Sequence, residues 1–217
     1  MKQFDLIVFD WDGTLMDSAG VIVQSIQAAC RDLAIDVPED AACRYIIGLG
    51  LSEALQRLLP NLPEADYPVL VERYRHHYLI QDQTIPLFAG AGQVVRDLHA
   101  AGYLLGVATG KSRKGLDRVL ESTGLGAFFH ATRCADECFS KPHPEMLEQL
   151  MHELGVVPER TLMVGDTIHD LQMAQQARVA ALAVSYGAHE PAALLACAPR
   201  ACVNSIEALD QWLQACA

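Results

Sequence analysis

The chain has 217 residues, 51% of them hydrophobic, so it is long enough to bury the interior of an enzyme, either as one large domain or as a core with a smaller insert. Its formal net charge of −11, with no basic run among the 16 Lys and Arg residues, would repel a phosphate backbone and argues against nucleic acid as a partner. The sequence shows neither a secretory signal nor the roughly 18 uninterrupted apolar residues of a membrane span, so we expect a cytoplasmic protein without a membrane partner.

Strand and helix patterns alternate over most of the chain. A short apolar segment, residues 4–9, stops abruptly at Asp10, which is typical of a buried parallel strand. Gly102 and Ser112 stand where a helix end and a helix N-cap are expected. The alternation predicts an α/β fold, a parallel sheet with helices on both faces. Its further strands are predicted at 104–108, 161–164, 179–184 and 201–203, and its helices at 91–101, 112–122, 143–154 and 168–177.

Residues 16–84 break this alternation, because they hold three or four amphipathic helical segments and no convincing strand. The first helix is predicted from Asp17 or Ser18 to about Leu33. Since the segment interrupts the sheet directly after Asp10, it should lie over the end of that strand. We therefore expect a small α-helical domain at 16–84 on a core formed by 1–15 and 85–217.

The segment Asp10-Trp11-Asp12-Gly13-Thr14 is the sharpest local signal, since four such fixed residues match by chance in about one of a thousand chains of this length. Two carboxylates just past a buried strand can serve as nucleophile and general acid/base if a metal neutralises one of them. The alternative for this motif alone is a solvated, Asp-rich turn.

Residues 10–17 match the pattern Asp-x-Asp-Gly-Thr-Leu-x-Asp at each defined position, so the sequence resembles the phosphatases of the haloacid dehalogenase superfamily. The resemblance implies three further motifs at the carboxyl ends of later strands, in a fixed order, on a Rossmann-like parallel sheet. All three are present in that order. They are Thr109-Gly110, Ser140-Lys141-Pro142 and Gly165-Asp166 with Asp170.

These later motifs supply the candidate phosphate-binding residues. The Thr109 hydroxyl, followed by Gly110, can donate to a phosphate oxygen at the start of a helix, where backbone N–H groups also favour an anion. The resemblance implies that Lys141 pairs with the nucleophile and the phosphoryl group. His143 lies between two prolines, and we expect a solvated or locally bonded side chain there rather than a metal ligand.

Asp166 and Asp170 are four residues apart, and this spacing places them on one helical face. The resemblance implies a Mg²⁺ ion held by Asp10, the backbone carbonyl of Asp12, and Asp166, a ligand set that suits this hard cation. Asp170 would contact these ligands without binding the ion itself, or it would pair with Lys141. A purely structural reading, with Asp166 as a helix N-cap and Asp170 in the first turn, is compatible with the same geometry. A nearby magnesium ion and lysine are expected to lower the pKa of Asp10.

The reaction implied by the resemblance is hydrolysis of a small phosphate monoester, phosphoglycolate being the model, through an aspartyl phosphate on Asp10. Asp12 would protonate the leaving group and later deprotonate water, while Mg²⁺, Lys141 and Thr109 neutralise charge. A sugar phosphomutase, a nucleotidase and a pyrophosphatase stay open as alternatives, and so does a non-catalytic binding module on the same fold. The expected partner is a small phosphorylated metabolite, and the expected state a monomer or homodimer.

The helical segment 16–84 would determine the substrate specificity of such an enzyme. Residues 47–51 resemble the loop of the helical domain that meets the substrate, so Gly48 is a candidate binding residue. Arg44, Arg57 or the cluster at 73–77 could reach a substrate carboxylate, although long cationic side chains on helices are usually solvated.

Overall fold

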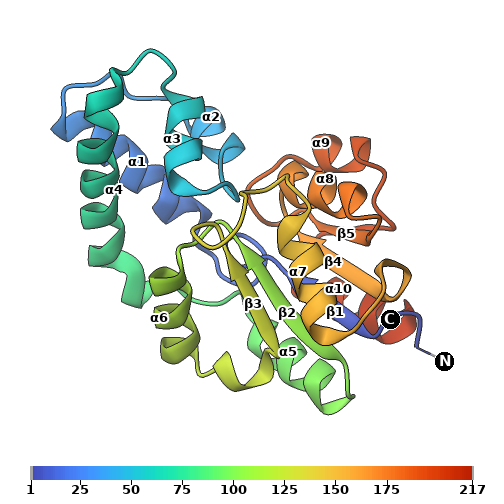
Figure 1. The fold of residues 1–217 in the computed structure, drawn as a ribbon. Helices are drawn as coiled ribbons and strands as arrows, with labels where there is room; N and C mark the ends of the chain where they lie inside the picture. The colour runs from blue at the N-terminus through green and yellow to red at the C-terminus, as the bar shows by residue number, and fades with distance from the viewer. Residues whose placement is uncertain (1, 217) are drawn as a thin grey trace.

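The computed structural model describes residues 2–216, and a parallel six-stranded sheet forms its centre (Figure 1). The spatial order of the strands is β3-β2-β1-β4-β5-β6. Each neighbouring pair is parallel, so all carboxyl ends lie at the same edge. The strands are β1 (Leu6–Phe9), β2 (Leu104–Thr109), β3 (Ala131–Cys134), β4 (Thr161–Gly165), β5 (Ala180–Val184) and β6 (Cys202–Val203).

Strand β1 lies in the middle of the sheet, and all four of its side chains are buried. Leu6 and Val8 face one side and join the core formed by α7 (Glu145–Leu154) and α8 (Ile168–Gln176). Ile7 and Phe9 face the other side, because side chains alternate along a strand. They join a core that includes α5 (Ala91–Ala100), α6 (Arg113–Thr123) and α10 (Ile206–Cys216). Helices thus cover both faces, which confirms the predicted α/β fold.

The sequence interpretation missed strand β3, the short helix α9 (Pro191–Ala196) and helix α10. Strand β3 has only its first and last side chains buried, because Thr132 and Arg133 lie at the sheet edge and are partly exposed. A four-residue edge strand of this kind contains no apolar run that could have revealed it. Helix α10 contributes Ile206, Leu209 and Leu213 to the core, and it covers the same face of the sheet as α5.

The helix ends follow the predicted signals. Gly102 adopts a positive φ of 77° just after α5, a left-handed conformation that favours glycine. Ser112 caps α6, and its Oγ accepts a hydrogen bond from the N–H of Gly115 at 3.3 Å. The short helix α9 (Pro191–Ala196) precedes β6. No helix within residues 2–216 combines the length and apolar character needed to cross a membrane.

Four helices follow β1 and gather beyond the carboxyl ends of the strands, at the upper left of Figure 1. Helix α1 packs against α4 and buries Ile22, Ile26 and Ala29. The chain enters and leaves this helical group side by side, since the N–H of Phe88 donates to the carbonyl of Leu15 at 3.0 Å. The helices are α1 (Ala19–Asp32), α2 (Asp40–Tyr45), α3 (Leu51–Leu58) and α4 (Tyr67–Gln81).

Candidate active site

Polar side chains gather where the central strands end. Asp10 follows β1, Thr109 ends β2 and Asp166 follows β4. Because β1 pairs with both β2 and β4 in parallel, their carboxyl ends bring these three residues together. Lys141 and Asp170 join them, and the side chains of all five are almost completely buried. The set contains three carboxylates, one hydroxyl and one ammonium group. Burying such groups destabilises the folded state unless they pair with each other or with a ligand.

Lys141 links two of the acids. Its Nζ donates to Asp10 Oδ1 at 2.6 Å and lies 2.6 Å from Asp170 Oδ1. Asp170 Oδ2 is held by the backbone N–H of Thr167 at 3.1 Å and by its hydroxyl at 2.7 Å. Thr167, rather than Asp166, is therefore the N-cap of α8, and the structural alternative for Asp166 is wrong. The pairing of Lys141 with Asp170 is one of the two roles expected for this acid.

Asp166 is fixed by its surroundings on both sides. Its Oδ1 accepts from the Thr14 hydroxyl at 2.9 Å, and its Oδ2 accepts from the N–H of Ala188 at 2.7 Å. A Cβ atom at Gly13 would lie 2.1 Å from Asp166 Oδ2, and one at Gly187 would lie 2.2 Å from it. The two glycines therefore make room for the carboxylate, and Gly13 also needs its positive φ of 80°.

The acids raise one another's pKa. Burial raises the pKa of Asp10 well above its usual range; Lys141 acts against this, while Asp170 and Asp166 add to it. Burial and the neighbouring Asp170 likewise raise the pKa of Asp166 to about 7, although hydrogen bonds from Ala188 and Thr14 lower it. Lys141 lowers the pKa of Asp10 as expected, but burial and like charges outweigh it among the protein groups alone, and the lowering by a magnesium ion stays a prediction.

The donor set suits a divalent cation. Carboxylate oxygens of Asp10, Asp166 and Asp170 lie within 4.8 Å of one another. Asp10 Oδ2 is buried and has no hydrogen-bond partner among the described residues. A cation among these carboxylates would relieve the repulsion between them, and hard cations prefer oxygen ligands. Two members, Asp10 and Asp166, are the predicted ligands, and Asp170 is the third carboxylate of the group. The backbone carbonyl of Asp12 as a further ligand stays a prediction.

Asp12 is held by one of its two oxygens. Its Oδ1 accepts from the Ser18 hydroxyl at 2.5 Å and lies 3.0 Å from Lys111 Nζ. Lys111 Nζ also donates to the hydroxyl of Tyr78 on α4 at 2.9 Å. Burial lowers the pKa of Lys111, but the adjacent Asp12 and Tyr78 outweigh this effect and raise it. Burial raises the pKa of Tyr78 to about 12, so its hydroxyl stays protonated.

The loop before α3 touches the sheet-bearing part at its motif residues. A Cβ atom at Gly110 would lie 2.5 Å from the carbonyl oxygen of Leu49 and 2.7 Å from that of Gly48. The N–H of Gly50 donates to Ser140 Oγ at 2.8 Å. Thr109 Oγ1 accepts from the N–H of Lys111 at 3.2 Å, which leaves its own proton to donate. The structure thus brings Gly48 to the predicted phosphate-binding motifs.

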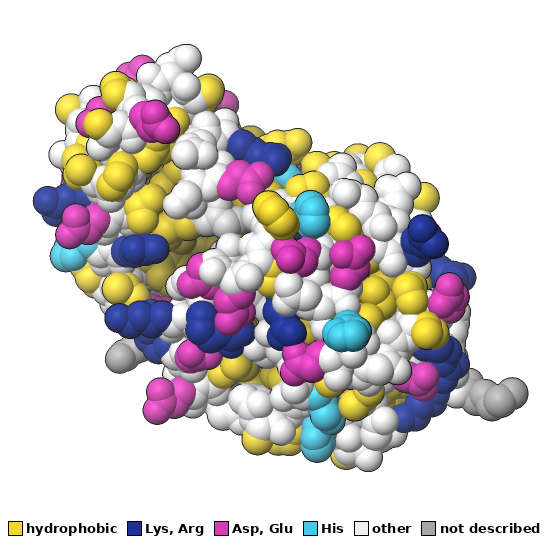
Figure 2. Space-filling view, in the orientation of Figure 1, with side chains coloured by type: hydrophobic (Ala, Val, Ile, Leu, Met, Phe, Trp, Pro, Cys, Tyr) yellow, Lys and Arg dark blue, Asp and Glu magenta, His cyan; other side chains and the backbone are white. Residues whose placement is uncertain are grey.

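A cavity of about 790 Å³ opens between the helical group and the sheet-bearing part. Figure 2 shows it as a hollow, with hydrophobic side chains on its inner wall and Lys and Arg side chains along its edge. Asp12, Lys111 and Gly110 lie on one side of it, and Tyr74 and Tyr78 of α4 lie on the other. The cavity therefore reaches Asp12 and Gly110 and is bounded by both parts of the chain, whereas the buried side chains of Asp10, Lys141 and Asp166 are not among its lining residues.

Other candidates lie elsewhere. Of the cations suggested for a substrate carboxylate, only Arg75 lines the cavity among the described residues, whereas Arg57 pairs with Glu53 on the surface of α3 at 2.7 Å. Arg44 is not among the lining residues. His143 is exposed and accepts from the N–H of Glu145 at 3.3 Å, as expected for a locally bonded side chain.

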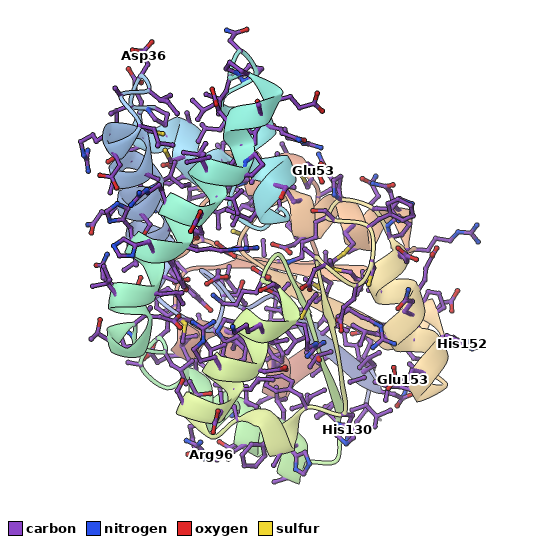
Figure 3. All side chains as sticks on the ribbon, turned by 60° about the vertical axis from the view of Figure 1, so that its left-hand side comes forward. Asp36, Glu53, Arg96, His130, His152 and Glu153 are labelled. Atoms are coloured by element: carbon purple, nitrogen blue, oxygen red, sulfur yellow. The ribbon has the colours of Figure 1, made fainter. Side chains whose placement is uncertain are left out.

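Further polar groups lie far from the cavity. Figure 3 shows Asp36 at the outer tip of the helical group and His130, His152 and Glu153 toward the opposite end of the molecule. None of these four side chains lines the cavity within the described part of the chain. They are not part of the candidate site.

Sequence reasoning missed three side chains around Asp12. Lys111 directly follows the motif Thr109-Gly110, but nothing in its local sequence distinguishes it from a surface lysine. Ser18 and Tyr78 belong to helical segments, and their roles depend on contacts with Asp12 and Lys111 that span 6 and 33 residues. A buried, paired lysine can be recognised only from its environment.

Comparison with known proteins agrees with this geometry. Residues 7–184 match the family described as haloacid dehalogenase-like hydrolase. The probable phosphatase IndB of Dickeya dadantii (strain 3937) is 37% identical over 206 residues, covering 92% of this chain and 89% of that protein. A phosphoglycolate phosphatase of Agrobacterium fabrum (strain C58) is 32% identical over 191 residues, covering 84% and 81%.

A solved structure agrees as well. The crystal structure of a protein from Haemophilus somnus 129PT, described as a predicted phosphoglycolate phosphatase, superposes with a TM-score of 0.85 at 26% identity. The superposition covers 94% of this chain and 96% of that one. The match spans more than three quarters of the sequence, the motif residues meet at one edge of the sheet, and the chain therefore belongs to the haloacid dehalogenase-like hydrolase family.

Proposed function

We propose that this hydrolase is a Mg²⁺-dependent phosphatase that cleaves a small phosphate monoester through an aspartyl phosphate on Asp10. The observation that carries the proposal is the state of the Asp10 carboxylate. Lys141 holds Oδ1, while Oδ2 is buried without a hydrogen-bond partner among the described residues. A fixed carboxylate with one free oxygen is suited to nucleophilic attack.

The proposed reaction has two steps. Asp10 Oδ2 attacks phosphorus, the bond to the ester oxygen breaks, and Asp12 gives its proton to the departing alcohol. Water then attacks the aspartyl phosphate, Asp12 takes a proton from it, and inorganic phosphate leaves with Asp10 restored. Lys141 and the Thr109 hydroxyl would offset charge on the phosphoryl oxygens. Mg²⁺ held by Asp10 and Asp166 would supply further charge neutralisation and orient the phosphoryl group.

We further propose that residues 1–15 and 85–217 form the catalytic core and that 16–84 form a cap. The side-by-side connections at Leu15 and Phe88 support this division, and so does the position of α1 to α4 beyond the strand ends (Figure 1). The contact of the 47–51 loop with Gly110 supports a role for Gly48 beside the phosphate. A cap in this position would exclude bulk water during the first step.

Phosphoglycolate is the first substrate to test, because a relative carries that activity in its name. The cavity of about 790 Å³ is of the size that accommodates a drug-sized ligand, so larger esters belong in the same comparison. The panel should include nucleoside monophosphates, sugar phosphates and pyrophosphate, ranked by kcat/KM.

The test of the reaction uses Asp10→Asn, with Asp36→Asn as the matched control at an exposed position. With Mg²⁺ present, Asp10→Asn should lower p-nitrophenyl phosphate hydrolysis by roughly 10⁴-fold or more, and excess EDTA should abolish wild-type activity. Acid quenching with labelled substrate should trap a phosphoenzyme in the wild type and in Asp36→Asn but not in Asp10→Asn. Substantial turnover by a folded Asp10→Asn variant would refute the nucleophile assignment.

A further inference from the structure

We propose that Lys111 is a positioning residue that fixes the acid/base Asp12 by one oxygen and makes its proton transfer depend on the cap residue Tyr78. This inference rests on the proposed function, because it concerns how Asp12 protonates the leaving group. Lys111 directly follows the motif Thr109-Gly110 and takes no part in the reaction steps proposed above.

The contacts of Asp12 are one-sided. Both of its partners, Ser18 Oγ at 2.5 Å and Lys111 Nζ at 3.0 Å, meet Oδ1. Within residues 2–216, Oδ2 has no hydrogen-bond partner, and the residue lines the cavity. A general acid needs one oxygen free to carry the proton and the other fixed, so that the proton is held in one direction. The geometry therefore leaves Oδ2 as the oxygen that is free to contact a leaving group.

The ammonium group of Lys111 is buried and has partners on both sides of the cavity. Its side chain is 9% exposed, and burying an ammonium group is costly unless partners replace water. Asp12 is one partner and the Tyr78 hydroxyl, at 2.9 Å, is the other. The ring centroid of Tyr78 also lies 5.0 Å from Nζ, which adds a cation–π attraction. The cap helix α4 thus supplies half of the environment that holds this cation.

Two neighbouring cations on the same side of the cavity are arranged differently. Lys114 lines the cavity but is exposed, and no partner for its ammonium is present in the described part of the chain. Arg118 pairs with Asp82 Oδ2 at 2.8 Å. Lys111 alone among these three reaches the acid/base. This difference makes Lys114 a matched control, because it carries the same charge and borders the same cavity.

Loss of Lys111 would leave Oδ1 with Ser18 as its single partner, and the carboxyl group could then turn. The resulting defect depends on the leaving group. A p-nitrophenolate departs as a stable anion and needs little help from an acid, whereas an alkyl alkoxide must be protonated as it leaves. A lysine that merely tied the cap to the core, or bound the phosphate, would affect both kinds of ester equally.

The experiment measures kcat/KM, which reports steps up to release of the alcohol, for p-nitrophenyl, phenyl and alkyl phosphates with Mg²⁺. Lys111→Met should lose about 10- to 100-fold on alkyl phosphates, part of the 10²- to 10⁴-fold that acid catalysis typically contributes, and about 3-fold or less on p-nitrophenyl phosphate. Tyr78→Phe should change the same ratio in the same direction by a smaller factor. Lys114→Met should leave the ratio between the two esters at the wild-type value.

Equal losses on all esters in Lys111→Met, or a changed ratio in Lys114→Met, would overturn the inference. If Lys111→Met does not fold, as judged by circular dichroism, Tyr78→Phe decides, because it removes one hydroxyl and keeps the ring; an unchanged ratio in that variant would equally overturn the role. Failure of the proposed function looks different, since the wild type would then show no Mg²⁺-dependent hydrolysis of any ester.

Discussion

Replacement of Asp166 by Asn should change the free energy of unfolding in a pH-dependent way. The difference between the variant and the wild type should favour the variant more at pH 8 than at pH 5. Asp166 is completely buried beside Asp170, and together these effects raise its pKa from 3.8 to about 7. A carboxyl group whose pKa is raised by folding binds more protons in the folded chain than in the unfolded chain. Its contribution to stability is therefore greatest at low pH and is lost as the pH rises from about 4 to about 7.

The magnitude follows from the two pKa values. In wild-type protein without metal, Asp166 destabilises the folded state by about 2 kcal/mol at pH 5 and about 4 kcal/mol at pH 8. Asn cannot ionise. Its amide oxygen can accept from the N–H of Ala188, and its amide nitrogen can donate to the oxygen of the Thr14 hydroxyl, so the energy of these contacts is the same at both pH values. Between pH 5 and pH 8, the difference in free energy of unfolding between variant and wild type should therefore shift by about 2–3 kcal/mol in favour of Asn.

The assay is urea unfolding in EDTA at pH 5 and pH 8, with EDTA present so that no cation stabilises the ionised carboxylates. Asp36→Asn is the control, because this side chain is exposed at the outer tip of the helical group (Figure 3). This variant should stay within about 0.5 kcal/mol of wild type at both pH values. A difference between Asp166→Asn and wild type that does not change with pH would refute the argument from burial and like charge.

Three further predictions concern the same cluster. At pH 8, Mg²⁺ should raise the melting temperature of the wild type, by an amount equivalent to about 2.7 kcal/mol at 100 times Kd, but not that of Asp166→Asn; scanning fluorimetry showing equal shifts would argue against this cation site. Lys141→Met leaves two buried carboxylates without their cation and should cost about 3–5 kcal/mol in urea at pH 8; an unchanged midpoint would contradict the ion pairs. Gly13→Ala places a Cβ 2.1 Å from Asp166 Oδ2 at a positive φ and should cost clearly more in urea than Gly124→Ala, which has a positive φ but open space and should lose about 1–2 kcal/mol. Equal losses in the two glycine variants would show that backbone conformation, rather than contact with the acid, sets the cost.

Much of the fold was predictable because its signals are local. The apolar run that ends at Asp10 is a strand buried on both faces, and such strands need no alternation of polar residues. Ser112 and Gly102 mark helix ends by side-chain and backbone chemistry that acts within a few residues. The edge strand at Ala131 was hidden for the converse reason, since half of its side chains are partly exposed and its pairing partner lies in β2.

The amino-acid sequence by itself determined which side chains meet at the edge of the sheet. Asp10, Thr109 and Asp166 each lie at the carboxyl end of a strand, and parallel pairing brings such ends together wherever the intervening chain runs. Only the tertiary structure decided how these groups are charged and held. The raised pKa of Asp10, the approach of Asp170 to the carboxylates of Asp10 and Asp166, and the link from Asp12 through Lys111 to Tyr78 depend on burial and on contacts between distant segments. Electrostatic energies change with distance and dielectric environment, and neither quantity can be read from spacing along the chain.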